Sequence, residues 1–157
     1  MSTYFAVKLI HILSATVLFG TGLGTAFFML RAYLAEDEHA MLPTARSVVL
    51  ADWLFTTPAV IVQVVTGVWL TQILGVSWGS AWFIAVIGLF GLTGLCWLPV
   101  VWIQIRVREL LASGATKDRY RKLMRAWITL GAIAFSSVIV IFYLMVTKTG
   151  IAWILLE

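Results

Sequence analysis

Four long apolar stretches dominate this chain and restrict what it can fold into. They are Tyr4 to Leu30, Trp53 to Leu74, Ala81 to Ile105 and Trp127 to Thr147. At a rise of about 1.5 Å per residue, a helix made from any of them can cross the roughly 30 Å hydrocarbon core of a bilayer. Val138 to Met145 is apolar or aromatic on every face, which disfavours the alternating strands of a membrane barrel. We therefore predict an all-α polytopic membrane protein, an antiparallel bundle of four transmembrane helices.

A soluble fold is excluded by composition. The 157 residues are 62% hydrophobic, with a mean hydropathy of +1.01, and so small a domain could not bury that much apolar surface. We treat residues 1–157 as a single membrane domain with helices at about 4–30, 53–74, 81–105 and 127–147. The first stretch exceeds a signal-peptide core and lacks a clear cleavage site, so we expect it to be retained. Glu36 to His39 and Ser113 to Ala115 are expected as polar loops.

The basic residues predict the orientation in the membrane. Nine of the eleven lie between the first and second or the third and fourth stretches, and only Lys8 and Lys148 lie near the termini. By the positive-inside rule, both basic loops are cytoplasmic, whereas the termini and the Gly75 to Ser80 turn face outward. The net charge of +4 is then a topology signal that favours contact with lipid headgroups over nucleic acid. The nine residues are Arg31, Arg46, Arg106, Arg108, Lys117, Arg119, Arg121, Lys122 and Arg125.

Polar residues gather on single faces of the first two predicted helices. At about 100° per residue, His11, Ser14, Gly22 and Thr25 share one face of the first helix. The second helix has a polar face of its own, although Pro58 is expected to kink this helix. Because lipid cannot satisfy hydrogen-bonding groups, we expect the two polar faces to meet. The polar face of the second helix consists of Asp52, Thr56, Gln63 and Thr66.

Small and charged residues predict further helix contacts. Gly20 and Gly24 form a GxxxG pair on the first helix, opposite its polar face, and Gly88, Gly91 and Gly94 allow the third helix to pack closely. Near the cytoplasmic side, Asp52 is expected to reach Arg106 as a structural ion pair, because an unpaired charge is costly in the bilayer. Pro99 is expected to bend the third helix.

His11 is the candidate functional residue, since an ionisable side chain within a membrane span is expensive. It can be a structural imidazole bonded to a carbonyl, threonine or glutamine, an axial ligand of haem, a ligand of copper, or a proton-transfer group. Met145 is a soft second ligand or a core residue. Lys8 and Lys148 could neutralise a haem propionate, or Lys8 could extend to the headgroups.

Four segments of this sequence resemble the bacterial integral membrane proteins that carry the "domain of unknown function 2269". The segments are Lys8 to Ala15, Leu18 to Ala26, Ala51 to Thr56 and Trp97 to Arg106, and the likeness extends over nearly the whole chain. The resemblance implies a location in the bacterial inner membrane and no particular activity. More distantly, a lysine and a histidine on the first of four helices are similar to the HemJ-type oxidases and the CopD-type copper-resistance proteins. The HemJ likeness implies haem b at His11, without implying the oxidase activity.

Two classes of function follow from this sequence. The first is a membrane protein that binds haem b, or alternatively copper, through His11 and exchanges electrons with quinone or porphyrin. The second is a non-enzymatic bundle, either a small transporter or a partner subunit of a larger membrane complex. The partner subunit would dock through the Gly20 and Gly24 face. A transporter would need a homodimer, because one copy of so small a chain cannot enclose a path.

Overall fold

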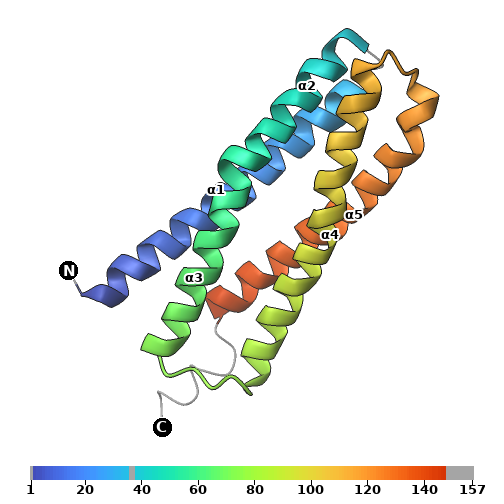
Figure 1. Ribbon diagram of the computed structural model, residues 1–157. Coiled ribbons are helices and arrows are strands. Elements are labelled where there is room, and N and C mark those ends of the chain that lie inside the picture. The colour runs from blue at the N-terminus through green and yellow to red at the C-terminus, as the bar shows by residue number, and fades with distance from the viewer. Residues whose placement is uncertain (1, 36–37, 148–157) are drawn as a thin grey trace.

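The computed structural model describes residues 2–35 and 38–147, and within these ranges the chain is helical and has no strand. Three of the crossings are the single helices α1 (Thr3–Leu34), α4 (Ala81–Ala112) and α5 (Lys117–Thr147). The other is continuous through α2 (Glu38–Ala51), the π-helix η1 (Asp52–Thr56) and α3 (Thr57–Ile73). Four helices in the described ranges are long and apolar enough to span a membrane, and they run antiparallel (Figure 1). The predicted all-α membrane bundle of four helices is confirmed.

The helices extend beyond the apolar stretches that predict them. The second crossing begins at Glu38 rather than at Trp53, so His39 is helical and not in a loop. Glu36 and Asp37 lie outside the described residues. The predicted break at Ser113 to Ala115 is confirmed as a turn, in which Gly114 has a φ of +74°, a value that suits a residue without a Cβ. The extensions were missed because hydropathy marks only the part of a helix within hydrocarbon, and 32 residues reach about 48 Å.

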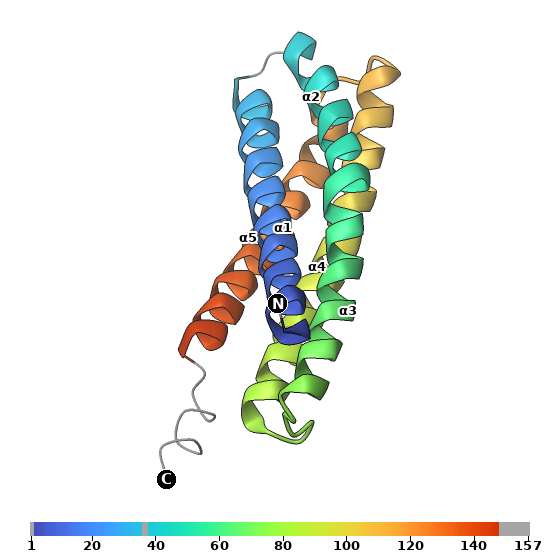
Figure 2. The same ribbon diagram turned by 90° about the vertical axis from the view of Figure 1, so that its left-hand side faces the viewer.

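All nine basic residues between the spans lie toward one end of the bundle. This end, which we call the basic end, carries the α1–α2 and α4–α5 connections, whereas the far end carries the start of α1 and the α3–α4 turn (Figures 1 and 2). The main hydrophobic core is at the basic end. Its most deeply buried side chains come from α1, α2, α4 and α5, and they are Met29, Met41, Ala45, Val48, Val107 and Met124.

Nearer the far end, a few specific contacts attach α5 to the other helices. The Phe19 ring of α1 stacks on Phe135 with a centroid separation of 4.9 Å and also contacts Phe142 at 5.4 Å. The indole nitrogen of Trp82 donates to the carbonyl oxygen of Leu144 at 2.8 Å. Large apolar side chains on the outside of the helices, such as Leu95 and Val146, are exposed, as expected for surfaces that face lipid.

The π-helix η1 has a local cause in the sequence. Pro58 has no N–H and cannot donate to a carbonyl in the preceding turn. Just before Pro58, the helical turn is wider by one residue than an α-helical turn. The Thr57 N–H donates to the Asp52 carbonyl, five residues earlier, and the Thr57 hydroxyl donates to the same oxygen at 2.9 Å. The disturbance expected at Pro58 therefore takes the form of a π-turn, a feature often found at functional sites.

Candidate functional site

One face of the second span is buried and mostly polar through η1 and most of α3. Asp52, Thr56, Ala59 and Thr66 are its buried residues in η1 and α3, and Gln63 lies half-buried between them. These five positions alternate in spacings of four and three residues, so they form one continuous stripe along the helix. The stripe extends over about 21 Å of the roughly 30 Å hydrocarbon thickness. Polar groups are therefore held inside the bundle through most of the membrane.

At the far half of this stripe, α1 and α3 are joined through His11. The imidazole Nδ1 lies 2.8 Å from the Thr66 hydroxyl oxygen, and Nε2 lies 2.9 Å from the Gln63 amide nitrogen. The Ser14 hydroxyl contacts the Gln63 amide oxygen and is 2.9 Å from the His11 carbonyl oxygen. The meeting of the two polar faces that the sequence predicts is therefore confirmed. We call His11, Ser14, Gln63 and Thr66 the histidine cluster.

The hydrogen bonds of the histidine cluster determine where the imidazole proton resides. The Thr66 hydroxyl donates to the Val62 carbonyl at 2.6 Å, so its oxygen accepts from the Nδ1–H of His11. Nε2 is then the acceptor for the Gln63 amide group, and the Gln63 oxygen accepts from Ser14. Every polar atom of the neutral imidazole is satisfied in this arrangement.

The same four side chains can also satisfy a protonated imidazole. When Nε2 gains a proton, it needs an acceptor in place of the Gln63 NH₂ group. A half-turn of the Gln63 amide presents its oxygen to Nε2–H and its NH₂ group to the Ser14 oxygen. The Ser14 hydroxyl then donates to the His11 carbonyl oxygen, which it already approaches within 2.9 Å. The cluster can thus accommodate either protonation form of His11 without moving a helix.

The other residues predicted to act with His11 in binding a cofactor are not brought to its ring. Lys8 is exposed, and its Nζ lies 5.4 Å from the centroid of the Tyr4 ring. Met145 is half-buried on α5, whereas both hydrogen bonds of the imidazole are with α3. Lys148 lies outside the described residues. Haem iron or copper needs a free lone pair on one ring nitrogen, and both nitrogens of His11 are engaged. The histidine cluster as arranged does not fit a metal ligand, and haem b or copper stays a prediction.

A second polar group lies at the start of the same stripe, on η1. Asp52 is 4% exposed, and its Oδ1 accepts from the Thr56 hydroxyl at 2.9 Å. Gln104 of α4, which is 3% exposed, is the other side chain that lies near this carboxyl group. The Asp52 Oδ2 and Gln104 Oε1 atoms are buried and have no hydrogen-bond partner among the described residues. The side chains known to approach Asp52 within the described chain, Thr56 and Gln104, are therefore both neutral.

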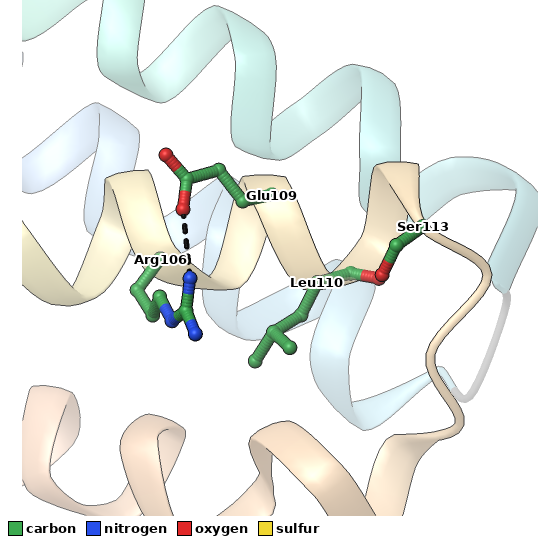
Figure 3. Close-up of polar contacts among 4 residues, drawn as sticks. All are labelled: Arg106, Glu109, Leu110 and Ser113. Atoms are coloured by element: carbon green, nitrogen blue, oxygen red, sulfur yellow. Dashed lines mark hydrogen bonds and ion pairs between the residues drawn. The ribbon is translucent and has the colours of Figure 1, made fainter.

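The predicted ion pair between Asp52 and Arg106 is wrong. Arg106 points away from the core and forms an ion pair with Glu109 at 3.1 Å, and both side chains are about half exposed (Figure 3). These two residues line a surface hollow with Trp102 and Ile105. Positions 104 and 106 of one helix are about 200° apart, so when Gln104 faces the core Arg106 cannot. An exposed pair of this kind contributes at most about 1 kcal/mol.

The glycine that permits a close contact between helices is not one of the five that the sequence predicts. A Cβ added at any of the five predicted packing glycines, which are Gly20, Gly24, Gly88, Gly91 and Gly94, would meet no atom within 4 Å. These residues therefore make no close helix contact within the described chain. The close approach is instead at Gly67 of α3, where an added Cβ would lie 3.3 Å from His11 Cε1. Gly67 follows Gln63 by one helical turn, and this spacing is the signal that could have identified it.

Comparison with known proteins supports the membrane assignment. A family model described as "Predicted integral membrane protein (DUF2269)" matches residues 5–149, a range that includes His11, Asp52 and Gln104. Neither the curated proteins nor the solved structures give a match. The resemblance to the HemJ and CopD types therefore stays a prediction. Because the family description names no activity, the function has to be argued from the site.

Proposed function

The chain belongs to the DUF2269 family of predicted integral membrane proteins, and we propose that it carries protons through the bilayer. The two proton-binding groups in this proposal are His11 in the far half of the bundle and Asp52 toward its basic end. The buried polar face of the second span lies between them. The observation that supports the proposal best is that both groups are held inside the bundle by neutral hydrogen-bonding side chains and, among the described residues, neither has an ion-pair partner.

The absence of a counter-ion separates this site from a structural ion pair. An ionisable group in a membrane helix is costly, so such groups are rare and often mark proton or ion pathways. A charge held permanently in the bundle would need an opposite charge nearby. A group that is neutral for part of a cycle does not, because hydrogen bonds to Thr, Ser and Gln suit both forms. The half-turn available to the Gln63 amide meets this requirement at His11.

The proposal is tested by proton flux into liposomes. The purified chain is reconstituted with a pH-sensitive dye inside, and a potassium gradient with valinomycin provides the driving voltage. We expect faster acidification than in empty liposomes, and at least a tenfold lower rate in His11→Phe, which keeps a ring but has no proton-binding nitrogen. The matched control is His39→Phe, since His39 is exposed at the start of α2. Wild-type flux no greater than that of empty liposomes would disprove the proposal.

Haem b or copper at His11, with quinone or porphyrin as redox partner, is the alternative proposal. The proton-carrying proposal predicts the opposite, because both ring nitrogens of His11 already have hydrogen-bond partners. It predicts that protein purified from cells with ample haem shows no Soret band that depends on His11. Absorption spectra of the wild type and His11→Phe, with metal analysis of both, make the measurement. A Soret band present in the wild type and absent from His11→Phe would establish a haem ligand and remove the proton-binding role of His11.

We also propose that the protein lies in the bacterial inner membrane with its basic end in the cytoplasm, following the positive-inside rule. Ser77 and Ser113 are exposed residues in turns at opposite ends of the bundle. In a Cys96→Ala background, we expect Ser77→Cys to react with a membrane-impermeant maleimide on intact spheroplasts. Ser113→Cys should react only after the membrane is permeabilised. The reverse pattern would invert the orientation.

A further inference from the structure

Three buried polar atoms toward the basic end have no hydrogen-bond partner within residues 2–35 and 38–147. They are Oδ2 of Asp52, Oε1 of Gln104 and Nε1 of Trp127, and the three side chains are 4%, 3% and 6% exposed. In folded proteins such atoms are nearly always bonded to protein or to ordered water. Leaving one of them unbonded typically costs about 1–3 kcal/mol. Three together therefore indicate a bound species.

The helices place these three side chains at a common level. Gln104 lies near the Asp52 carboxyl group, so α4 approaches η1 at this level. Along α4, Gln104 lies about 12 Å before the end of the helix at Ala112, and along α5, Trp127 lies about 15 Å after the start at Lys117. Since α4 and α5 are antiparallel neighbours joined by a short turn, this spacing puts Gln104 and Trp127 at levels that differ by about 3 Å. Trp127 also belongs to the same buried core as Ile103, the neighbour of Gln104.

The three atoms offer two acceptors and one donor. A water molecule has two donor hydrogens and accepts through its oxygen, and buried waters typically make about three hydrogen bonds to polar groups that lack other partners. We propose that Asp52, Gln104 and Trp127 form a binding site for one water molecule. The water accepts from the Trp127 indole N–H and donates to the Gln104 oxygen and to Asp52 Oδ2.

This water can remain bound whichever form Asp52 takes. When the carboxyl group is ionised, the water donates to Oδ2. When Oδ2 carries a proton, the water accepts from that O–H and from the indole, while still donating to Gln104. The water thus gives Asp52 a hydrogen-bond partner in both its ionised and its protonated form. Its role beside a proton-binding Asp52 rests on the proposed function. The water itself is indicated by the three unpartnered atoms alone.

The indole proton of Trp127 provides a direct test. In protein labelled with ¹⁵N-tryptophan and held in lipid nanodiscs, each of the eight tryptophans gives an indole signal, and Trp127→Phe identifies the one from Trp127. We expect the Trp127 indole proton to show a cross-peak to water despite its burial, and we expect Gln104→Leu to lose at least four-fifths of it. Trp102→Phe is the matched control, because Trp102 is exposed on α4 and its removal should leave the Trp127 cross-peak unchanged.

The outcomes separate the water site from the proton pathway. Absence of the cross-peak in the wild type would overturn the water site, and Trp127→Phe is needed only to assign the signal. A Trp127 indole signal that follows the sodium concentration at constant ionic strength would assign the site to a cation and would also overturn it. A cross-peak without proton flux would support the water site and remove the proposed function. Proton flux without a cross-peak would support the proposed function and remove the water site.

Discussion

Asp52→Asn should lower proton flux into liposomes at least tenfold while the bundle stays folded. An asparagine amide has nearly the same size as the carboxyl group, and its oxygen can still accept the 2.9 Å hydrogen bond from Thr56. It cannot take up or release a proton in the accessible pH range. Because Asp52 has no ion-pair partner among the described residues, the substitution leaves no uncompensated charge behind, which is the usual cause of large destabilisation at buried charges.

A second carboxylate serves as the control for this experiment. Asp118 lies in the first turn of α5, its side chain is 88% exposed, and it is 3.9 Å from Arg121. We expect Asp118→Asn to retain the wild-type flux, since an exposed pair at this separation is weak. Circular dichroism and size-exclusion chromatography show whether each variant is folded. Equal flux in Asp52→Asn and the wild type would exclude Asp52 from the pathway, and equal loss in both variants would show that the assay reports surface charge.

The polar faces of the helices could be predicted because helical periodicity is local. His11 and Ser14 on α1, and Gln63 and Thr66 on α3, are placed on their faces by a rotation of about 100° per residue. Lipid cannot bond these groups, so the faces had to meet. Nothing beyond sequence spacing and the membrane assignment was needed for that conclusion. The donor and acceptor roles within the histidine cluster required the coordinates, because they depend on which atoms come within about 3 Å of each other.

The partner of Asp52 could not be predicted in the same way. Charge alone favours Arg106, and both Gln104 and Arg106 lie near the end of the predicted third helix. Only the rotation of α4 about its axis decides which of them faces the core, and that rotation depends on the packing of Ile103 and Val107, which are buried on either side of Gln104. The π-turn at η1 adds to the difficulty, because it shifts the phase of the second span by one residue at Asp52.

The glycines show that small residues predict where a close contact is possible and not where one occurs. Gly20 and Gly24 have the spacing of a helix-packing pair, yet an added Cβ at either meets nothing within 4 Å in the described chain. Their face is free for the docking of a partner subunit that the sequence predicts, a prediction that stays open. Gly67 has no such partner in the sequence and is the glycine that a neighbouring side chain approaches.

Gly67→Val should therefore be the most destabilising of the glycine-to-valine substitutions within the described helices. A Cβ at this position lies 3.3 Å from His11 Cε1 and 4.0 Å from Nδ1, and the two methyl groups of valine add volume around that carbon. The imidazole must move away from Thr66 and Gln63, which breaks two interhelical hydrogen bonds. Overpacking costs about 1–3 kcal/mol and each lost bond about 0.6 kcal/mol in a membrane bundle, so we expect the free energy of unfolding to fall by about 2–4 kcal/mol.

The matched control for this substitution is Gly88→Val on α4, where an added Cβ would meet no atom within 4 Å. Both variants place a β-branched residue in the middle of an apolar helix, so the difference between them isolates the collision with His11. Unfolding in mixed micelles, followed by circular dichroism, measures both free energies. We expect Gly88→Val to stay within about 1 kcal/mol of the wild type. If the two variants lose similar stability, the imidazole does not occupy the space beside Gly67. The hydrogen bonds that support proton binding at His11 would then lose their structural basis, because the ring reaches Gln63 and Thr66 only through that space.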